Sequence, residues 1–150
     1  MPRYNYFLIL VVVIFGSYKI MQKPLNVRNN NPLNIRFNEF NDWDGQTGAS
    51  GGFSVFESPE YGFRAAYRLI STYQTRYNLH SVSDIVSRWA PESENHTQGY
   101  IDYIAGKLNK WDWTPVRREE MPALLYWMAE FEGANGAFTY EQINAGIELA

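Results

Sequence analysis

The chain has 150 residues, of which 45% are hydrophobic, and a formal net charge of −3. This length fits one domain with a short appendage, and the weak negative charge gives no electrostatic footprint for nucleic acid. Cysteine is absent and the two histidines, His80 and His96, lie apart, which excludes disulfides and argues against a zinc site. Phosphate-binding glycine motifs are also absent, and we expect no metal and no cofactor. Aromatic residues are abundant (11 Tyr, 9 Phe and 5 Trp), and such rings fill cores or serve as platforms for sugars.

A continuous apolar run, YFLILVVVIF, covers residues 6–15 and has positively charged residues on both flanks. With residues 16–21 the span reaches about 16 residues, shorter than the roughly 20 of a comfortable transmembrane helix and longer than many signal-peptide cores. No clear cleavage site follows. We therefore expect residues 1–23 to be an uncleaved single-pass membrane anchor that contacts lipid through residues 6–21. A cleaved signal peptide and a buried core strand are the alternatives, and the flanking charges leave the orientation open.

An asparagine-rich stretch, VRNNNPLNIRFNEFNDWDG, covers residues 27–45. Asn30-Asn31-Pro32 is typical of a turn, because asparagine bonds to nearby backbone and tolerates left-handed conformations. Residues 35–37 and 53–56 alternate as short strands do, and the glycine-rich residues 44–52 are expected to form a turn. These patterns predict a small antiparallel sheet. The amides and the guanidinium would suit a ligand rich in hydroxyl and amide groups, and a satisfied polar turn is the alternative.

About five helices are expected in the rest of the chain. Ser58-Pro59-Glu60 opens the first, an amphipathic helix that Asn78 ends. Three more follow capping pairs, Ser81 with Asp84, Asn95 with Gln98 and Thr139 with Gln142. Residues 122–131 are apolar on nearly every side, so they predict the central helix of the domain, ended by Gly133. The sequence thus predicts a mainly α domain, of α+β type, over residues 24–150.

Glu132 is the sharpest candidate for catalysis, because it closes this apolar helix beside Phe131. A carboxyl that loses hydration has a raised pKa and can act as the general acid that cleaves a glycosidic bond. An exposed helix-terminal glutamate is the alternative, although a helix C-terminus disfavours negative charge. A second carboxylate, which a standard hydrolase needs, has no distinguishing context; the candidates are Glu39, Asp42, Asp44, Glu92 and Glu94. Lytic transglycosylase chemistry fits better, because the substrate's own 6-hydroxyl attacks and one glutamate serves as acid and then as base.

Four blocks in the chain resemble a family of phage and prophage proteins known as virion structural proteins or lysozyme-like lysis proteins. They are RNNNPLNIR at 28–36, WDG at 43–45, FSVFESPEYGFRA at 53–65 and WAPESENHTQGYI at 89–101. The blocks are similar, more distantly, to the flagellar-type glucosaminidases of the lysozyme superfamily. In that family a helix ending in Glu-Ser-Gly precedes an Asn-Asn motif, whereas here the matching segment, residues 128–133, lies at the other end of the chain. The resemblance therefore implies a circular permutation of a lysozyme-like fold, with Glu132 beside the loop of residues 30–36.

The resemblance also implies roles for individual residues. Glu132 is the expected general acid and base. The expected substrate-binding residues, for each of which packing or capping is the alternative, are Asn30, Asn31, Asn34, Arg36, Trp43, Phe56, Asn95 and Tyr100. The asparagines are expected to hold substrate and acid in register rather than to catalyse.

The function expected from these features is cleavage of peptidoglycan glycan strands by a membrane-anchored phage enzyme, at cell entry or at lysis. The anchor would lie in the host inner membrane, with the domain facing the periplasm, or in a virion membrane. Expected partners are the glycan strands, lipid and other virion proteins. The first alternative is a non-catalytic virion membrane protein that retains the lysozyme-like fold, and the second is an unrelated binding module tethered to a membrane.

Overall fold

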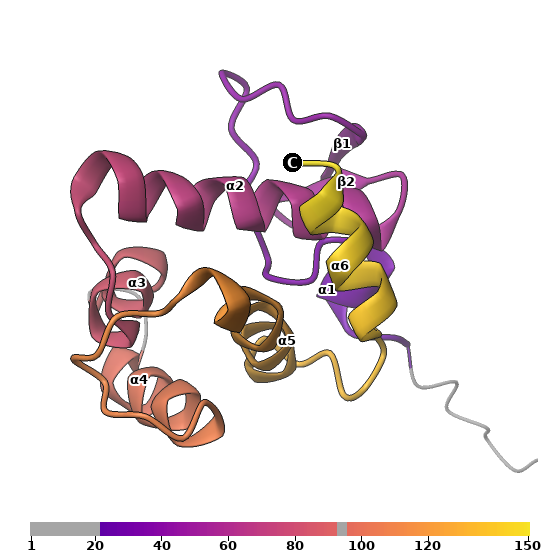
Figure 1. Cartoon of the computed structure of the whole chain (residues 1–150). Coiled ribbons are helices and arrows are strands. Elements are labelled where there is room, and N and C mark those ends of the chain that lie inside the picture. The colour runs from indigo at the N-terminus through magenta and orange to yellow at the C-terminus, as the bar shows by residue number, and fades with distance from the viewer. Residues whose placement is uncertain (1–21, 93–95) are drawn as a thin grey trace, which may run out of the picture.

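The structure is a computed structural model that describes residues 22–92 and 96–150, and these residues fold into a mainly helical domain with a small two-stranded sheet (Figure 1). In chain order the elements are α1 (Leu25–Arg28), β1 (Gln46–Ser50), β2 (Phe53–Phe56), α2 (Pro59–Tyr77), α3 (Val82–Trp89), α4 (Thr97–Lys107), the 3₁₀ turn η1 (Arg118–Glu120), α5 (Met121–Phe131) and α6 (Tyr140–Glu148). The predicted mainly α class with a small antiparallel sheet is confirmed.

The sheet is an antiparallel hairpin, but its strands differ from the predicted pair. β1 lies within the glycine-rich segment that was predicted to be a turn, and it pairs with β2. Residues 35–37, predicted to be a strand, contribute only an isolated bridge between Arg36 and Phe53. Pairing with β2 overrides the weak strand propensity of β1, so the prediction for these two segments is wrong.

The helix boundaries follow local signals in the sequence. Pro59 begins α2, and Asn78 ends it in the left-handed conformation. Ser81 and Thr139 open α3 and α6 with reciprocal capping boxes, as predicted. The short helix α1 was not predicted, because its four residues are too few to show a helical periodicity.

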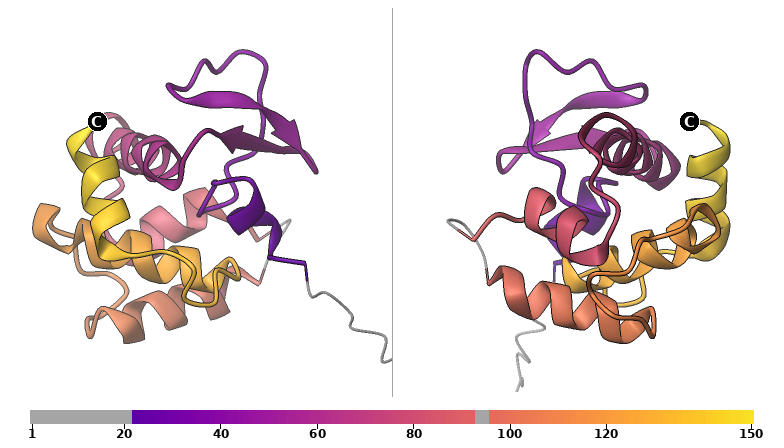
Figure 2. Two further views of the ribbon diagram at one scale, coloured as in Figure 1. Left: turned by 90° about the vertical axis from the view of Figure 1, so that its right-hand side faces the viewer. Right: turned by 60° about the vertical axis from the view of Figure 1, so that its left-hand side comes forward.

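Helix α5 is at the centre of the domain, as its apolar sequence predicts. It packs against α2, α4 and α6, and Leu124, Leu125 and Met128 are fully buried. Figure 2 shows α6 crossing the end of α2 that lies near the hairpin, with α3 and α4 on the other side of α5. The end of α5 that carries Glu132 is thereby brought toward the N-terminal part of the domain.

The predicted membrane anchor, residues 6–21, lies outside the described residues. Across residues 22–92 and 96–150, every helix is too short or too polar to cross a lipid bilayer.

Candidate active site

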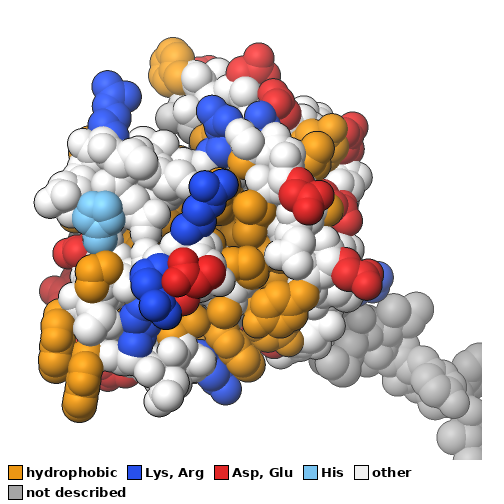
Figure 3. Space-filling view, in the orientation of Figure 1, with side chains coloured by type: hydrophobic (Ala, Val, Ile, Leu, Met, Phe, Trp, Pro, Cys, Tyr) orange, Lys and Arg blue, Asp and Glu red, His pale blue; other side chains and the backbone are white. Residues whose placement is uncertain are grey.

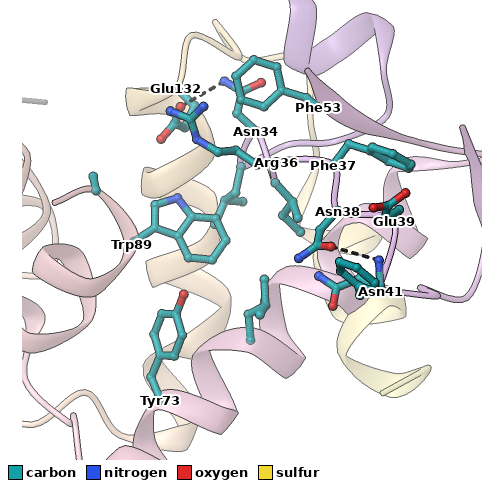
Figure 4. A pocket seen from close by; sticks show the side chains of 15 residues that line it. Asn34, Arg36, Phe37, Asn38, Glu39, Asn41, Phe53, Tyr73, Trp89 and Glu132 are labelled. Atoms are coloured by element: carbon teal, nitrogen blue, oxygen red, sulfur yellow. Dashed lines mark hydrogen bonds between the residues drawn. The ribbon is translucent and has the colours of Figure 1, made fainter. Parts of the chain in front are cut away.

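An open groove with a volume of about 800 Å³ runs between the 33–41 loop and the helices α2 and α3. This volume lies in the range of ligand-binding clefts. Glu132, at the end of α5, also lines the groove (Figure 4). The other lining residues are Leu33, Asn34, Ile35, Arg36, Phe37, Asn38, Glu39, Phe40, Asn41, Phe53, Leu69, Tyr73, Trp89 and Ala90.

Each oxygen of the Glu132 carboxyl accepts one hydrogen bond. The side-chain amide of Asn34 donates to Oε2 at 3.0 Å, and the hydroxyl of Tyr100 donates to Oε1 at 3.2 Å. Asn34 is 98 positions from Glu132 in the sequence, so the predicted proximity of the asparagine loop and the last turn of α5 is confirmed. The two bonds fix the orientation of a carboxyl that faces the groove.

Burial raises the pKa of Glu132 above its ordinary value, and the hydrogen bonds from Asn34 and Tyr100 oppose this shift only in part. Tyr100 is 2% exposed, and its ring stacks on Phe131 with centroids 3.8 Å apart, which keeps water away from one side of the carboxyl. Burial and the nearby Glu132 also raise the pKa of Tyr100 well above its usual value, so its hydroxyl remains a donor. A half-buried carboxyl with a raised pKa is suited to deliver a proton near neutral pH.

Asn34 has a backbone conformation that suits its role beside Glu132. Its φ of 51° is in the left-handed region, which asparagine adopts more readily than other non-glycine residues. Its Oδ1 is buried and has no hydrogen-bond partner among the described residues. Rotation of the amide by half a turn would let Oδ1 accept the proton of a neutral Glu132, so this side chain can serve both protonation states.

Asn30 and Asn31 hold the backbone of the asparagine-rich loop in place. Asn31 is fully buried; its amide donates to the carbonyls of Ile35 and Ser54, and its Oδ1 accepts from the Ile35 backbone. Asn30 donates to the Phe56 carbonyl. These bonds tie the loop to β2, which holds Asn34 in place.

The structure corrects several of the predicted substrate contacts. Asn31 and Phe56 are 0% and 1% exposed, so they belong to the core and not to the groove wall. Trp43 packs against the core, and neither Trp43 nor Asn30 is among the lining residues of the groove. Tyr100 is buried and contacts Glu132 in place of a sugar.

Among the remaining predicted residues, Asn34 and Arg36 line the groove. The guanidinium carbon of Arg36 lies 5.9 Å from the centroid of the Phe53 ring. Asn95 lies outside the described residues.

Two aromatic residues of the groove were missed as site residues. Trp89, which also packs partly buried against the core, and Tyr73 both line the groove, with ring centroids 6.4 Å apart. Figure 4 shows Trp89 between Glu132 and Tyr73. Helical periodicity places both residues on an apolar face but does not tell whether that face covers the core or a groove.

The other acidic residues differ sharply from Glu132. Both oxygens of Glu130 accept from the backbone N–H of Gly136, and Glu130 is not among the lining residues of the groove. Asp44 forms an ion pair with Arg64 at 2.6 Å. Glu39 is the second carboxylate that lines the groove. Within the described part of the chain, no group of three or more His, Asp or Glu side chains is placed to hold a metal ion.

No known protein-family model matches the sequence. The chain is similar to Protein P5 of Pseudoalteromonas phage PM2, with 35% identity over 145 residues that cover 93% of this chain and 89% of the phage protein. An identity of this size over nearly the whole of both chains shows common descent, and this chain belongs to the family of phage PM2 Protein P5.

Proposed function

We propose that this chain cleaves the glycan strand of peptidoglycan, with Glu132 as its single general acid and base. The observation that carries the proposal is the Glu132 carboxyl itself, which is half-buried, held at both oxygens and directed into an open groove. A lysozyme-like arrangement, in which a circular permutation has moved the catalytic helix to the C-terminal half, accounts for a site built from the two ends of the chain.

The groove suits a sugar polymer. It is open to solvent, and its lining combines amide side chains with aromatic rings. Amides bond to hydroxyl and N-acetyl groups, while aromatic faces pack on the apolar faces of sugar rings. The lining residues that would serve these two purposes are Asn34, Asn38, Asn41, Phe37, Tyr73 and Trp89.

The chemistry requires one carboxyl that changes its protonation state. Protonated Glu132 gives its proton to the glycosidic oxygen as the bond from that oxygen to C1 breaks. The resulting carboxylate, to which Asn34 and Tyr100 donate, then accepts the proton of the 6-hydroxyl as O6 attacks C1. The product is a 1,6-anhydro sugar, and Glu132 is protonated again. In a hydrolase, water would replace O6 and Glu39 would be the available second carboxylate.

The test is the loss of turbidity of purified cell walls treated with the full-length protein in detergent. Glu132→Gln should reduce the rate by a factor of about 10² to 10⁴, the usual contribution of a general acid. Glu130→Gln, two positions earlier and away from the groove, is the matched control and should retain the rate. Cleavage by Glu132→Gln at the wild-type rate would refute the mechanism. Mass spectrometry then separates anhydro products of a transglycosylase from the reducing ends left by a hydrolase.

We propose membrane anchorage through residues 6–21 and a role in the virion or in lysis as part of the same function. The family relationship to a phage protein supports a phage context. It also favours the second candidate, a virion structural protein that keeps the fold without cleaving glycan. That candidate predicts incorporation into particles and no change on Glu132→Gln in any wall assay.

A further inference from the structure

The loop between α4 and η1 presents two tryptophans to solvent. Trp111 and Trp113 are 68% and 65% exposed, and their indole rings stack with centroids 5.0 Å apart and planes 7° apart. The other three tryptophans pack partly buried against the core. Two large apolar rings held together at a surface form the kind of exposed patch that marks a binding site.

The loop that carries the pair is tightly bonded. The backbone N–H and the hydroxyl of Thr114 both donate to the Trp111 carbonyl, at 3.1 and 2.7 Å. The Ser83 backbone N–H donates to the Asp112 carbonyl at 2.9 Å, and Lys110 donates to the Pro115 carbonyl. The indoles are therefore displayed by a preorganised loop, which lowers the entropy lost when a ligand binds.

The position of the pair separates two candidate ligands. Figures 1 and 2 show the α4–η1 loop on the side of the molecule opposite to α1, where the described chain begins. A membrane entered by residues 6–21 would therefore lie on the far side from Trp111 and Trp113. Large hydrophobic side chains project at the edge of the molecule where this loop lies (Figure 3).

The Trp111–Trp113 pair is connected to the groove through helix α3. Helix α3 contributes Trp89 to the groove at its C-terminal end, and at its N-terminal end Ser83 holds the tryptophan loop. An eight-residue helix is about 12 Å long. The two places are thus about one short helix apart along α3, and a polymer that contacted both would be retained more strongly without a change in the groove.

We propose that Trp111 and Trp113 form a secondary binding site for the glycan strands of the cell wall, separate from the groove that contains Glu132. The inference rests on the proposed function, because it assumes that the substrate is a sugar polymer. The outer indole faces stack on the apolar C–H faces of N-acetylhexosamine rings, and the site retains the protein on the wall between cuts.

The experiment measures co-sedimentation of the full-length protein, in detergent, with purified peptidoglycan sacculi. All variants carry Glu132→Gln so that the wall is not consumed. Replacing both Trp111 and Trp113 by alanine should weaken binding about tenfold, or about 1.4 kcal/mol, whereas replacing both by phenylalanine should restore most of it. Tyr140→Ala removes another exposed aromatic residue and should bind as the parent does.

Two further measurements separate the outcomes. In a background with intact Glu132, cleavage of a short soluble chito-oligosaccharide should be unchanged by the double alanine substitution. Unchanged sacculus binding would overturn the inference, as would a loss of binding to phosphatidylglycerol vesicles with sacculus binding intact. Binding is measured in an inactive background, so it does not depend on cleavage. If the wild-type protein also failed to cleave walls while retention still depended on the two tryptophans, the proposed function would be refuted and this binding site would stand.

Discussion

At the scale of single residues, the two donors to Glu132 have opposite surroundings. Asn34 lies on the groove and Tyr100 is buried behind the carboxyl. Both stabilise the ionised form, whereas burial favours the neutral one. The pKa of Glu132 thus reflects burial, which raises it, and two hydrogen bonds, which lower it, so removal of either donor should change it.

Tyr100→Phe removes one of these donors and keeps the ring that stacks on Phe131. Loss of the hydrogen bond raises the pKa of Glu132 further, so the general acid stays protonated to higher pH. The alkaline limb of the kcat/KM profile for glycan cleavage should move up by about 0.5 to 1 pH unit. A purely structural role for Tyr100 would lower thermal stability and leave that limb in place.

Tyr73 lies on the groove beyond Trp89 as seen from Glu132. Tyr73→Ala removes a ring that can pack on substrate far from the reacting bond, so it should raise KM about three- to tenfold with little change in kcat. Tyr73→Phe should behave as the wild type. Tyr77→Ala, one helical turn further along α2 and not among the lining residues, is the control in steady-state kinetics. A fall in kcat with unchanged KM would contradict this assignment.

At the scale of secondary-structure elements, α6 packs extensively on α2, and Gly146 allows the close approach. A Cβ on Gly146 would lie 2.6 Å from the Glu60 carbonyl oxygen and 2.7 Å from Phe63 Cβ. Gly146→Ala should therefore cost about 1 to 3 kcal/mol of unfolding free energy through overpacking. Gly99→Ala in α4 has open space around its Cβ and should stabilise by about 0.5 to 1 kcal/mol. Urea denaturation checks both changes, and equal effects would contradict the close packing of α6 on α2.

Elements with local signals could be predicted, and elements made by distant partners could not. The ends of α2 follow from Pro59 and Asn78, and the start of α6 from Thr139 and Gln142. By contrast, β1 contains a glycine and a register irregularity, and it becomes a strand only because β2 pairs with it. The residues of β1 by themselves do not indicate that this pairing will form.

The same distinction holds for the site. The position of Glu132 at the end of an apolar helix was evident from the sequence, and so was the unusual polarity of the asparagine loop. The division of that loop into the buried scaffold residue Asn31 and the groove residue Asn34 was not. This division depends on which side-chain amide donates to the Ser54 carbonyl and which donates to Glu132. Alternating burial within a turn has no sequence period, so only the folded chain resolves it.

At the scale of the whole molecule, the groove joins segments from both ends of the described chain. Glu132 lies where these segments meet, and burial disfavours the ionised form of its carboxyl. The native state binds a proton on Glu132 more tightly than the unfolded chain does, because the folded pKa is raised. The contribution of Glu132 to the stability of the wild type should therefore fall as pH rises from the ordinary glutamate pKa of about 4.3 to the raised value, and level off above it.

Glu132→Gln removes this proton equilibrium and allows the contribution to be measured. The stability of the variant relative to the wild type should increase from pH 4 to pH 8, in urea titrations of the full-length protein, by about 1 kcal/mol per unit of pKa shift. Asp84→Asn is the control of opposite sign, because hydrogen bonds from Ser81 lower the pKa of Asp84. Asp84 stabilises the native state above its ordinary pKa and loses this effect as pH falls, so the deficit of the variant should shrink toward acid pH. A pH-independent difference for Glu132→Gln would mean that its carboxyl is as well solvated in the native state as in the unfolded chain.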